Sequence, residues 1–222
     1  MKKLVIFDLD GTLFNTTGAM TACGNYALEH LGLPLLTPEE YARVSGGGVE
    51  AFVCDVLSAA GDRDHANFDE FWRLYLEKNG LLTEDANVPY DGVEHVLSEL
   101  KRRGVRLAVL SNKDEASCIP IVEKAFGKGM FDCIVGGREG VPPKPDPTAV
   151  RALLRELGVS SEEGLYIGDT EIDMQTGQNA GLDTVAALWG YRERKVLEAY
   201  SPKYLAEQPL DVLSLEWADA VE

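Results

Sequence analysis

The chain has 222 residues, 45% of them hydrophobic and 26% charged, so it is long enough for one large domain or two small ones with a real core. Its formal net charge of -16 argues against nucleic acid and against an anionic membrane surface as partners, because both attract clustered Lys and Arg. If the ligand is itself an anion, its site must supply positive charge locally, from a metal ion or a lysine.

The first predicted element is a strand over residues 4–7, an apolar run that ends in Asp8, Asp10 and then Gly-Thr. The two aspartates are one residue apart, and each raises the cost of ionising the other. Two like charges at the carboxyl end of a buried strand therefore need a compensating positive charge close by.

Residues 16–87 show helical signals only, which predicts a helical subdomain inserted after the first strand. The signals are a capping box at Thr37, Pro38 and Glu40, an apolar run at 49–60 before Gly61, and an aromatic stripe at Phe68, Phe71, Trp72 and Tyr75. The insert would leave after residue 15 and return at residue 88, so two adjacent linkers would join it to the remainder, as in a hinge.

Strands and helices alternate through residues 88–222. Four more apolar runs, each too short for a helix, predict strands at 105–110, 133–135, 165–167 and 184–188. Caps and apolar spacing predict helices from Asp91 to Gly104 and from Asp146 to Gly158. The alternation predicts right-handed βαβ units. Residues 1–15 and 88–222 would therefore form an α/β domain with a Rossmann-like, doubly wound parallel sheet whose strands are buried on both faces.

Polar residues follow four of the five predicted strands at their carboxyl ends, where the binding crevice of an open parallel sheet lies. They are Asp8 and Asp10, then Ser111, Asn112 and Lys113, then Lys144, and last Asp169 and Asp173. Each alone could be a turn, a helix cap or a surface group. Together they crowd acids at one sheet edge, which is costly unless a cation compensates them. Oxygen ligands favour Mg2+, with a lysine completing the charge balance when phosphate arrives.

Four short motifs occur along the chain: DLDGT at 8–12, LSNK at 110–113, KPDP at 144–147 and GDTEID at 168–173. In the order and spacing of these motifs the sequence resembles, over nearly its whole length, the haloacid dehalogenase superfamily of phosphotransferases, and within it the phosphoglycolate phosphatase-like group. The resemblance implies a core of that fold with a helical cap at 16–87. It also implies a magnesium-dependent phosphatase that hydrolyses a small phosphate monoester through an aspartyl phosphate.

The resemblance further implies a role for each motif residue. Asp8 would be the nucleophile, Asp10 the general acid and base, Ser111 and the backbone amide of Asn112 the ligands of the phosphoryl oxygens, and Lys144 the cation beside nucleophile and phosphate. Asp8, Asp169, Asp173 (directly or through water) and the backbone carbonyl of Asp10 would hold the magnesium ion. Lys144 and magnesium are expected to lower the pKa of Asp8, while Asp10 lies further from them and is freer to carry a proton.

Two loops resemble segments of the same group. Residues 44–49, VSGGGV, resemble a cap loop that enters the site, where Gly46 and Gly47 would allow close backbone approach, and a plain flexible loop is the alternative. Arg43, just before this loop, is our candidate for binding a substrate carboxylate or second anion, because its planar donor fork suits one. Residues 188–192, LWGYR, resemble a further segment, for which simple loop packing by Trp189 and Tyr191 is equally open.

Two related activities do not fit the residues. Asp10 counts against a dehalogenase, which lacks the second aspartate, and a phosphonate hydrolase uses a cap lysine, whereas no lysine occurs here between Lys3 and Lys78. Several other activities stay open. A β-phosphoglucomutase, an inorganic pyrophosphatase or a nucleotidase of the same build fits the motifs, although SNK resembles the phosphatase pattern more. From a different class, a non-catalytic phospho-aspartate signalling or binding protein also combines acids, magnesium and a lysine. A signalling receiver, however, is shorter, and its phosphoacceptor follows the third strand.

The remaining expectations concern the surroundings of the protein. The four cysteines lie far apart without a C-x-x-C pair, as expected of reduced thiols in the cytoplasm. The apolar run after Lys2 and Lys3 is broken by Asp8 before it reaches the length of a signal peptide, and no run is of transmembrane length. We expect a cytoplasmic monomer or homodimer that acts on a small phosphorylated metabolite, without nucleic acid or membrane as partner.

Overall fold

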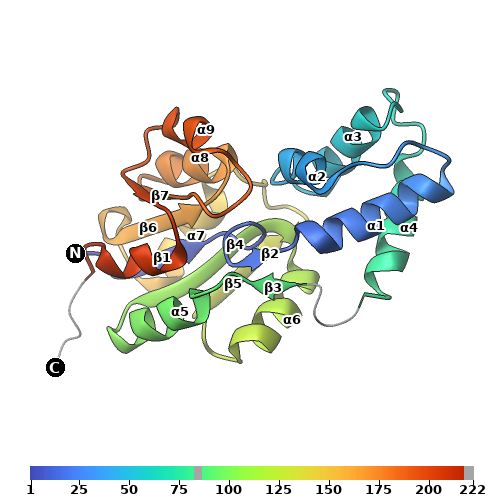
Figure 1. Cartoon of the computed structure of the whole chain (residues 1–222). Coiled ribbons are helices and arrows are strands. Elements are labelled where there is room, and N and C mark those ends of the chain that lie inside the picture. Colours follow the sequence, from blue (N-terminus) through green and yellow to red (C-terminus); the bar gives the residue numbers. More distant parts are fainter. Residues whose placement is uncertain (83–86, 218–222) are drawn as a thin grey trace. The chain divides into compact units, whose positions relative to one another are not determined.

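The computed structural model describes residues 1–82 and 87–217 of the chain (Figure 1). The chain divides into two compact units, of which the first is Met1–Phe14 with Pro89–Glu222 and the second is Asn15–Val88. Residues 83–86, inside the predicted insert, and residues 218–222 lie outside the described parts. Within those parts, no helix combines the length and the apolar composition that crossing a membrane requires.

The first unit contains a six-stranded parallel sheet in the order β5-β4-β1-β6-β7-β8. The strands are β1 (Leu4–Phe7), β4 (Arg106–Asp114), β5 (Cys133–Gly137), β6 (Gly164–Gly168), β7 (Asp183–Ala187) and β8 (Tyr204–Ala206). β1 lies between β4 and β6, so Phe7 pairs with Val109 on one side and with Ile167 on the other. All four residues of β1 are buried, as its apolar sequence predicts.

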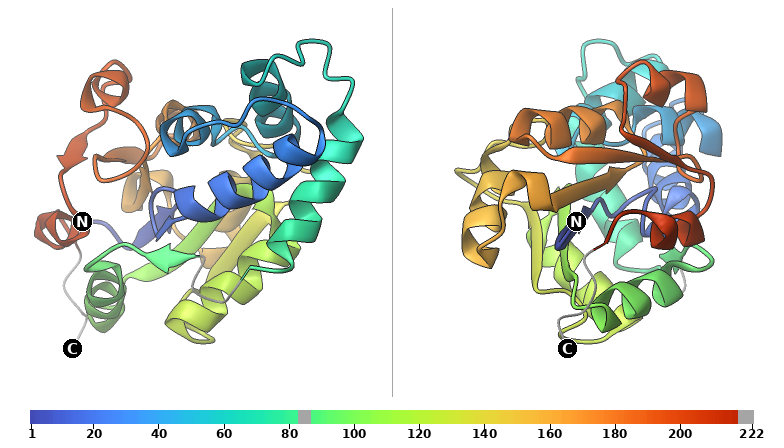
Figure 2. Two further views of the ribbon diagram at one scale, coloured as in Figure 1. Left: turned by 45° about the vertical axis from the view of Figure 1, so that its right-hand side comes forward. Right: turned by 90° about the vertical axis from the view of Figure 1, so that its left-hand side faces the viewer.

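Helices cover both faces of this sheet (Figure 2), because neighbouring residues of a strand point to opposite sides. They are α5 (Val93–Arg102), α6 (Glu115–Phe126), α7 (Thr148–Leu157), α8 (Glu171–Ala180) and the short α9 (Arg194–Glu198). Val5 and Phe7 of β1 share one buried cluster with residues of α5 and α6, whereas Leu4 and Ile6 share another with residues of α7. The predicted α/β fold with a doubly wound parallel sheet is confirmed.

The helix boundaries follow local signals in the sequence. Before α7, Asp146 Oδ1 accepts a hydrogen bond from the backbone N of Thr148 (2.8 Å), and the helix ends at Gly158, whose φ of 63° is left-handed. At α5 the prediction needs a correction. The N-cap residue is Gly92 and not Asp91, because the chain turns into this helix with a φ of 88°, which favours glycine.

Short strands and sheet edges account for the other differences. The sequence predicts that residues 133–135 are buried on both faces, but β5 lies at the sheet edge beside β4 alone and is mostly half-buried. β8 has no predicted counterpart, because three residues with an exposed Leu205 give no apolar run. The two-residue strands β2 (Phe14–Asn15) and β3 (Val88–Pro89) form a separate small sheet.

The described residues of the second unit form helices only, apart from loops and the ends of the small sheet. They are α1 (Thr17–His30), α2 (Pro38–Val44), α3 (Val49–Ala59) and α4 (Phe68–Asn79). The predicted capping box is present at α2, where the backbone N of Glu40 donates to the Thr37 hydroxyl and Glu40 accepts from the backbone N of Thr37. Tyr41 is fully buried and donates to Asn25 Oδ1 (3.1 Å), so this unit has a core of its own.

Candidate active site

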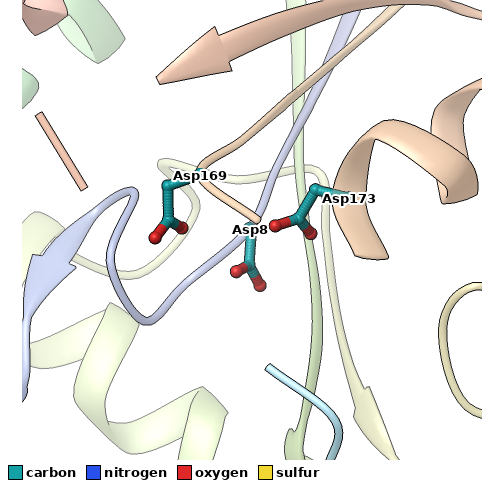
Figure 3. Close-up of side chains that lie close together, drawn as sticks. All are labelled: Asp8, Asp169 and Asp173. Carbon is teal, nitrogen blue, oxygen red and sulfur yellow. The ribbon is translucent and has the colours of Figure 1, made fainter. Parts of the chain in front are cut away.

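Three buried carboxylates gather at the carboxyl ends of β1 and β6 (Figure 3). Asp8 follows β1, Asp169 follows β6, and Asp173 lies in the first turn of α8. Each offers one oxygen, and these three oxygens lie within 4.8 Å of one another. Asp8 is 4% exposed and the other two are fully buried, so water screens their mutual repulsion poorly. The structure thus brings together three of the four acids that the sequence assigns to a metal site.

Lys144 is the cation inside this acid cluster. Its Nζ donates to Asp8 Oδ1 (2.7 Å) and to Asp173 Oδ1 (2.7 Å), and 3% of its side chain is exposed. Asn112 fixes the backbone of Lys144, because Asn112 Oδ1 accepts from the Lys144 N (2.8 Å) and Asn112 Nδ2 donates to the Lys144 O (3.2 Å). The sequence predicts a role for the backbone amide of Asn112 only. Its side-chain contact joins the end of β4 to the loop that follows β5, which local patterns do not reveal.

Asp173 is oriented by the start of α8. Thr170, the N-cap residue, donates to Asp173 Oδ2 from its backbone N (3.0 Å) and from its hydroxyl (2.7 Å). This capping box occupies Oδ2, whereas Oδ1 of Asp173 accepts from Lys144 and, at 3.4 Å, from the Tyr166 hydroxyl. Beneath the carboxylate lies Gly168, where a Cβ would stand 2.2 Å from the Cβ of Asp173. The sequence Thr-Glu-Ile-Asp carries a local signal for this capping box.

Asp169 is held through both of its carboxylate oxygens. Oδ1 accepts from the Thr12 hydroxyl (2.8 Å), and Oδ2 accepts from the backbone N of Tyr191 (2.9 Å). Trp189 Nε1 donates in turn to the backbone O of Thr12 (3.0 Å). At Gly11, with a φ of 86°, a Cβ would lie 2.2 Å from Asp169 Oδ2, so no larger residue fits. The segment 188–192 therefore does more than fill space, because it fixes an acid of the cluster.

Asp10 lies outside this acid cluster and has a cation of its own. Lys113 Nζ donates to Asp10 Oδ1 (2.8 Å) and Oδ2 (2.9 Å). Lys113 reaches Asp10 because β4, which carries it, is the neighbour of β1 in the sheet. The backbone N of Lys113 donates to Oγ of the buried Ser111 (3.1 Å), so the predicted phosphate ligand lies close to this ion pair. The sequence places Lys113 at a strand end, but no pattern there predicts its contact with Asp10.

Burial shifts the titration of the clustered acids. It raises the pKa of Asp8 to about 7, with the charge of Asp173 adding to the shift and Lys144 opposing it. Burial, followed by Asp173 and Asp8, also raises the pKa of Asp169 well above its ordinary value. The protein's own groups thus do not produce the predicted lowering at Asp8, because desolvation and like charges outweigh one ammonium. Although burial opposes it, Asp173 and Asp8 raise the pKa of Lys144.

The donor set of the acid cluster fits a hard divalent cation. The four acids of the site face two ammonium groups, those of Lys113 and Lys144, so a single divalent ion would balance their charges. The clustered groups offer oxygen atoms alone, which favours Mg2+ over metals that prefer nitrogen or sulfur. The raised pKa values of Asp8 and Asp169 point the same way, because an added positive charge would favour their ionised forms.

The predicted cap residues all lie in the second unit. Arg43 is exposed in the last turn of α2, and Gly46 and Gly47 lie in the loop before α3, where Gly46 has a φ of 112°. The next residue, Gly48, is the N-cap of α3 with a φ of 85°. The acids and lysines described above belong to the first unit. The part that Arg43 and the two glycines take in the site therefore stays a prediction.

Comparison with known proteins agrees with this architecture. The family model of haloacid dehalogenase-like hydrolases matches residues 5–187. A phosphoglycolate phosphatase of Aquifex aeolicus (strain VF5) is 35% identical over 214 residues, which make up 96% of this chain and 96% of that protein. The pyrophosphatase PpaX of Bacillus velezensis is 32% identical over 222 residues, covering 95% of this chain and 94% of that protein. The crystal structure of a predicted phosphoglycolate phosphatase from Haemophilus somnus 129pt has a TM-score of 0.87 at 26% identity and covers 96% of this chain and 97% of that one.

The sheet is parallel, and acids and a lysine lie at its carboxyl edge. Together with the match to the family model, these features define the class of the protein as a hydrolase. Its relatives of similar length are named phosphatases. The chain belongs to the haloacid dehalogenase-like hydrolase family.

Proposed function

We propose that the protein is a magnesium-dependent phosphatase that hydrolyses a small phosphate monoester through an aspartyl phosphate on Asp8. The preferred substrate in this proposal is 2-phosphoglycolate. One observation carries the proposal: the buried Asp8 has one oxygen on the Lys144 ammonium and lies in a cluster with Asp169 and Asp173. A carboxylate so placed can act as a nucleophile beside the positive charge that a phosphate requires. The name of the Aquifex aeolicus relative supports this choice of substrate.

In the first step of the proposed reaction, Asp8 attacks phosphorus. Lys144 occupies Oδ1, so we assign the attack to Oδ2. The bond between Oδ2 and phosphorus forms as the bond between phosphorus and the ester oxygen breaks, and Asp10 gives its proton to that oxygen. The leaving group departs as an alcohol. Ser111 and the backbone N of Asn112 hold the phosphoryl oxygens meanwhile, and the Ser111 hydroxyl can donate to one, because its oxygen accepts from Lys113.

In the second step, water hydrolyses the aspartyl phosphate. Asp10, now a carboxylate, takes a proton from the water as its oxygen attacks phosphorus. The bond between phosphorus and Oδ2 of Asp8 breaks, inorganic phosphate leaves, and Asp8 is a carboxylate again. Asp10 is left protonated and ready for the next substrate. One side chain thus loses and regains a proton in each cycle.

The charges of the site support phosphate chemistry. Asp8, Asp169, Asp173 and the backbone carbonyl of Asp10 would hold the magnesium ion, which supplies positive charge to the acids and to the transferred phosphoryl group. Lys144 contributes a fixed charge next to it, because hydrogen bonds on its backbone and its ammonium leave it little freedom. Phosphoryl transfer depends mainly on such placement and electrostatics.

We infer that the helical unit Asn15–Val88 is the cap of this enzyme, as the sequence predicts for residues 16–87, and that residues 1–15 and 88–222 are the core. The chain passes between the two units twice, after Phe14 and after Val88, and two such linkers suit a hinge. Arg43 and the loop with Gly46 and Gly47 are the candidates for contact with the substrate. Closure of a cap would exclude water from the reacting groups.

A screen of phosphate esters tests this function. The purified protein with Mg2+ is offered 2-phosphoglycolate, sugar phosphates, nucleoside monophosphates and pyrophosphate, and kcat/KM is compared. We expect the highest value for 2-phosphoglycolate and the loss of phosphate release after a chelator removes divalent ions. A higher value for pyrophosphate would move the assignment toward the activity named for the Bacillus velezensis relative. Release of phosphate from none of these compounds would contradict the phosphatase.

A further inference from the structure

Lys113 and Asp10 form an ion pair at the rim of the site. The Lys113 ammonium donates to both Asp10 oxygens, and 27% of the Lys113 side chain and 20% of the Asp10 side chain are exposed. Lys144, in contrast, has 3% of its side chain exposed and contacts the deep acids. The two lysines therefore serve different parts of the site. Lys144 lies where phosphorus would be attacked, and Lys113 lies at the acid that would serve the leaving group.

The backbone around Lys113 is fixed on both sides. Its N donates to Ser111 Oγ (3.1 Å), its O accepts from Cys118 Sγ (3.5 Å), and the next residue caps α6. The pairing of β4 with β5 shifts register between Leu110 and Asp114, so these residues leave the regular ladder. A Cβ on Gly136 of β5 would lie 2.7 Å from the Lys113 O, which shows how closely the two strands approach. The position of Lys113 is therefore set by the sheet and is not that of a mobile surface residue.

The proposed reaction requires this ion pair to open. Asp10 must present a protonated oxygen to the ester oxygen of the substrate, but in the structure both of its oxygens accept hydrogen bonds from the Lys113 ammonium, as those of a carboxylate do. When Asp10 takes up a proton from water and turns toward the ester oxygen, the Lys113 ammonium loses its counter-charge while most of its side chain is still buried. A partly desolvated ammonium without a counter-charge is unfavourable. An anion carried by the leaving group, next to the ester oxygen, would replace the missing carboxylate.

On this ground, and resting on the proposed function, we propose that Lys113 is a specificity-determining residue that binds a second anionic group on the leaving group of the substrate. The preferred substrates are phosphate monoesters with a carboxylate one carbon from the ester oxygen. 2-Phosphoglycolate has this arrangement, because its carboxylate is attached to the carbon that bears the phosphate ester. Lys113 thus exchanges the carboxylate of Asp10 for that of the substrate, at the moment when Asp10 is needed for proton transfer.

The test compares two esters that differ in this carboxylate. Values of kcat/KM are measured for 2-phosphoglycolate and for ethyl phosphate with the wild type, Lys113→Gln and Lys113→Arg. We expect Lys113→Gln to lower kcat/KM for both esters, because Asp10 loses its partner, but to lower it at least about tenfold more for 2-phosphoglycolate. The additional loss should appear in KM, and glycolate should inhibit the variant more weakly. Lys113→Arg should restore part of the preference, because it keeps the charge.

Lys128 provides a matched control variant. Its side chain is 85% exposed and its Nζ is 3.8 Å from Glu123, so Lys128→Gln removes the same charge from the same unit outside the site. We expect it to change neither ester's kcat/KM. Thermal unfolding of each variant reports whether the fold is intact.

Two outcomes would overturn the role of Lys113. One is a fall of kcat/KM by the same factor for both esters in Lys113→Gln, which would leave Lys113 as a partner of Asp10 only. The other is a preference for 2-phosphoglycolate that is lost in Arg43→Gln but kept in Lys113→Gln. In that case Arg43, the candidate from the sequence, would be the residue that binds the carboxylate of the substrate. Failure of the proposed function looks different, because the wild type would then hydrolyse neither ester.

Discussion

Asp8 depends on its neighbours for its chemistry. A buried carboxylate with a pKa of about 7 would be largely protonated in mildly acid solution and would then be a poor nucleophile. Lys144 opposes this shift through its bond to Oδ1, yet Asp173 and burial outweigh it. The proposed nucleophile would therefore be ionised more completely near pH 7 with the additional positive charge that we assign to Mg2+. This is a physical reason for the proposed metal site to include the proposed nucleophile, Asp8.

The replacement of Asp8 by Asn tests the nucleophile. Asp8→Asn keeps the size of the side chain but removes the charged oxygen, so we expect kcat to fall by a factor on the order of a thousand or more. The covalent phosphoenzyme, detected by mass spectrometry of the intact protein after acid quenching, should vanish. Asp64→Asn, at an exposed position of the second unit, is the control and should keep full activity. A phosphoenzyme that persists in Asp8→Asn would move the nucleophile to another residue.

The sequence predicted those site residues that lie in the segments after the carboxyl ends of strands. Asp8, Asp169, Asp173 and Lys144 fall at the carboxyl edge of the sheet once the strands are known, and the structure brings them together. The pair of Asp10 with Lys113 was not foreseen. These residues are 103 positions apart, and their contact depends on strand order and on the register shift at the end of β4. No local pattern encodes such a long-range contact.

At the scale of elements, the segment 188–192 after β7 acts as a support for the acid cluster. It reaches Asp169 through the backbone N of Tyr191, and it reaches Thr12 through the indole of Trp189. Thr12 completes the connection by its own bond to Asp169. Groups that orient metal ligands from outside affect metal affinity, because they fix the direction in which the ligand oxygens point. The loop after β7 should therefore matter for the metal more than for the fold.

Removal of the indole donor tests this support. Trp189→Phe keeps an aromatic ring but cannot donate to the Thr12 O, so we expect Mg2+ to bind roughly tenfold more weakly. Calorimetric titration of Mg2+ into protein freed of metal by a chelator measures this affinity without reliance on catalysis. Stability should fall by only about 1 kcal/mol, the usual cost of one hydrogen bond.

Trp217 offers a matched control for this experiment. Its Nε1 donates to the Val212 O (2.8 Å), a bond of the same chemistry in the same unit, and its side chain is buried. Trp217→Phe should lower the free energy of unfolding and leave the affinity for Mg2+ unchanged. If both variants weakened Mg2+ binding equally, the effect would be one of general stability and not of support for Asp169.

Elements with strong patterns were predicted well and weak ones were not. The run at residues 4–7 gave β1 with its observed ends, because four apolar residues between charged neighbours fit only a buried strand. The capping box of α2 was equally clear, since Thr37 and Glu40 have the required spacing. β8, in contrast, has three residues with an exposed Leu205, and it exists because β7 offers it a pairing edge. That edge is a property of the fold and not of the local sequence.

For the molecule as a whole, charge links stability to the metal ion. The chain carries a formal net charge of -16, and its site concentrates acids where water cannot reach them. The raised pKa values of Asp8 and Asp169 indicate that the folded protein binds protons on these buried acids more tightly than the unfolded chain does. If Mg2+ binds as proposed, folding, proton binding and metal binding are coupled through the same carboxylates.

The protein freed of metal should lose stability as the pH rises from about 4 to about 7. Asp8 has a pKa of about 7 in the folded protein against an ordinary value of 3.8, so the folded state binds this proton more tightly than the unfolded state does. Its stabilising effect is complete below the lower value and is lost as the pH passes through the higher one. We expect a change on the order of a few kcal/mol in the free energy of unfolding. Urea unfolding at several pH values, with a chelator present, measures it.

Saturating Mg2+ should remove this loss, because an ion bound to the folded protein favours the ionised acids and adds its own binding free energy. Asp8→Asn cannot titrate at this position, so its stability should depend less on pH in the absence of metal. Equal pH profiles of unfolding with and without Mg2+ would show that the ion does not bind among these acids.

The central position of β1 has a consequence for the order of synthesis. β1 and Asp8 leave the ribosome early, but the strands that flank β1 begin only at Arg106 and Gly164. Asp173 and the loop that holds Asp169 come later still. A nascent chain therefore carries the proposed nucleophile in water, where a lone carboxylate binds a cation only weakly. We expect the proposed metal site and the proposed reactivity to form together, once the loop that holds Asp169 has been translated, so a translation product that ends before Tyr191 should be inactive.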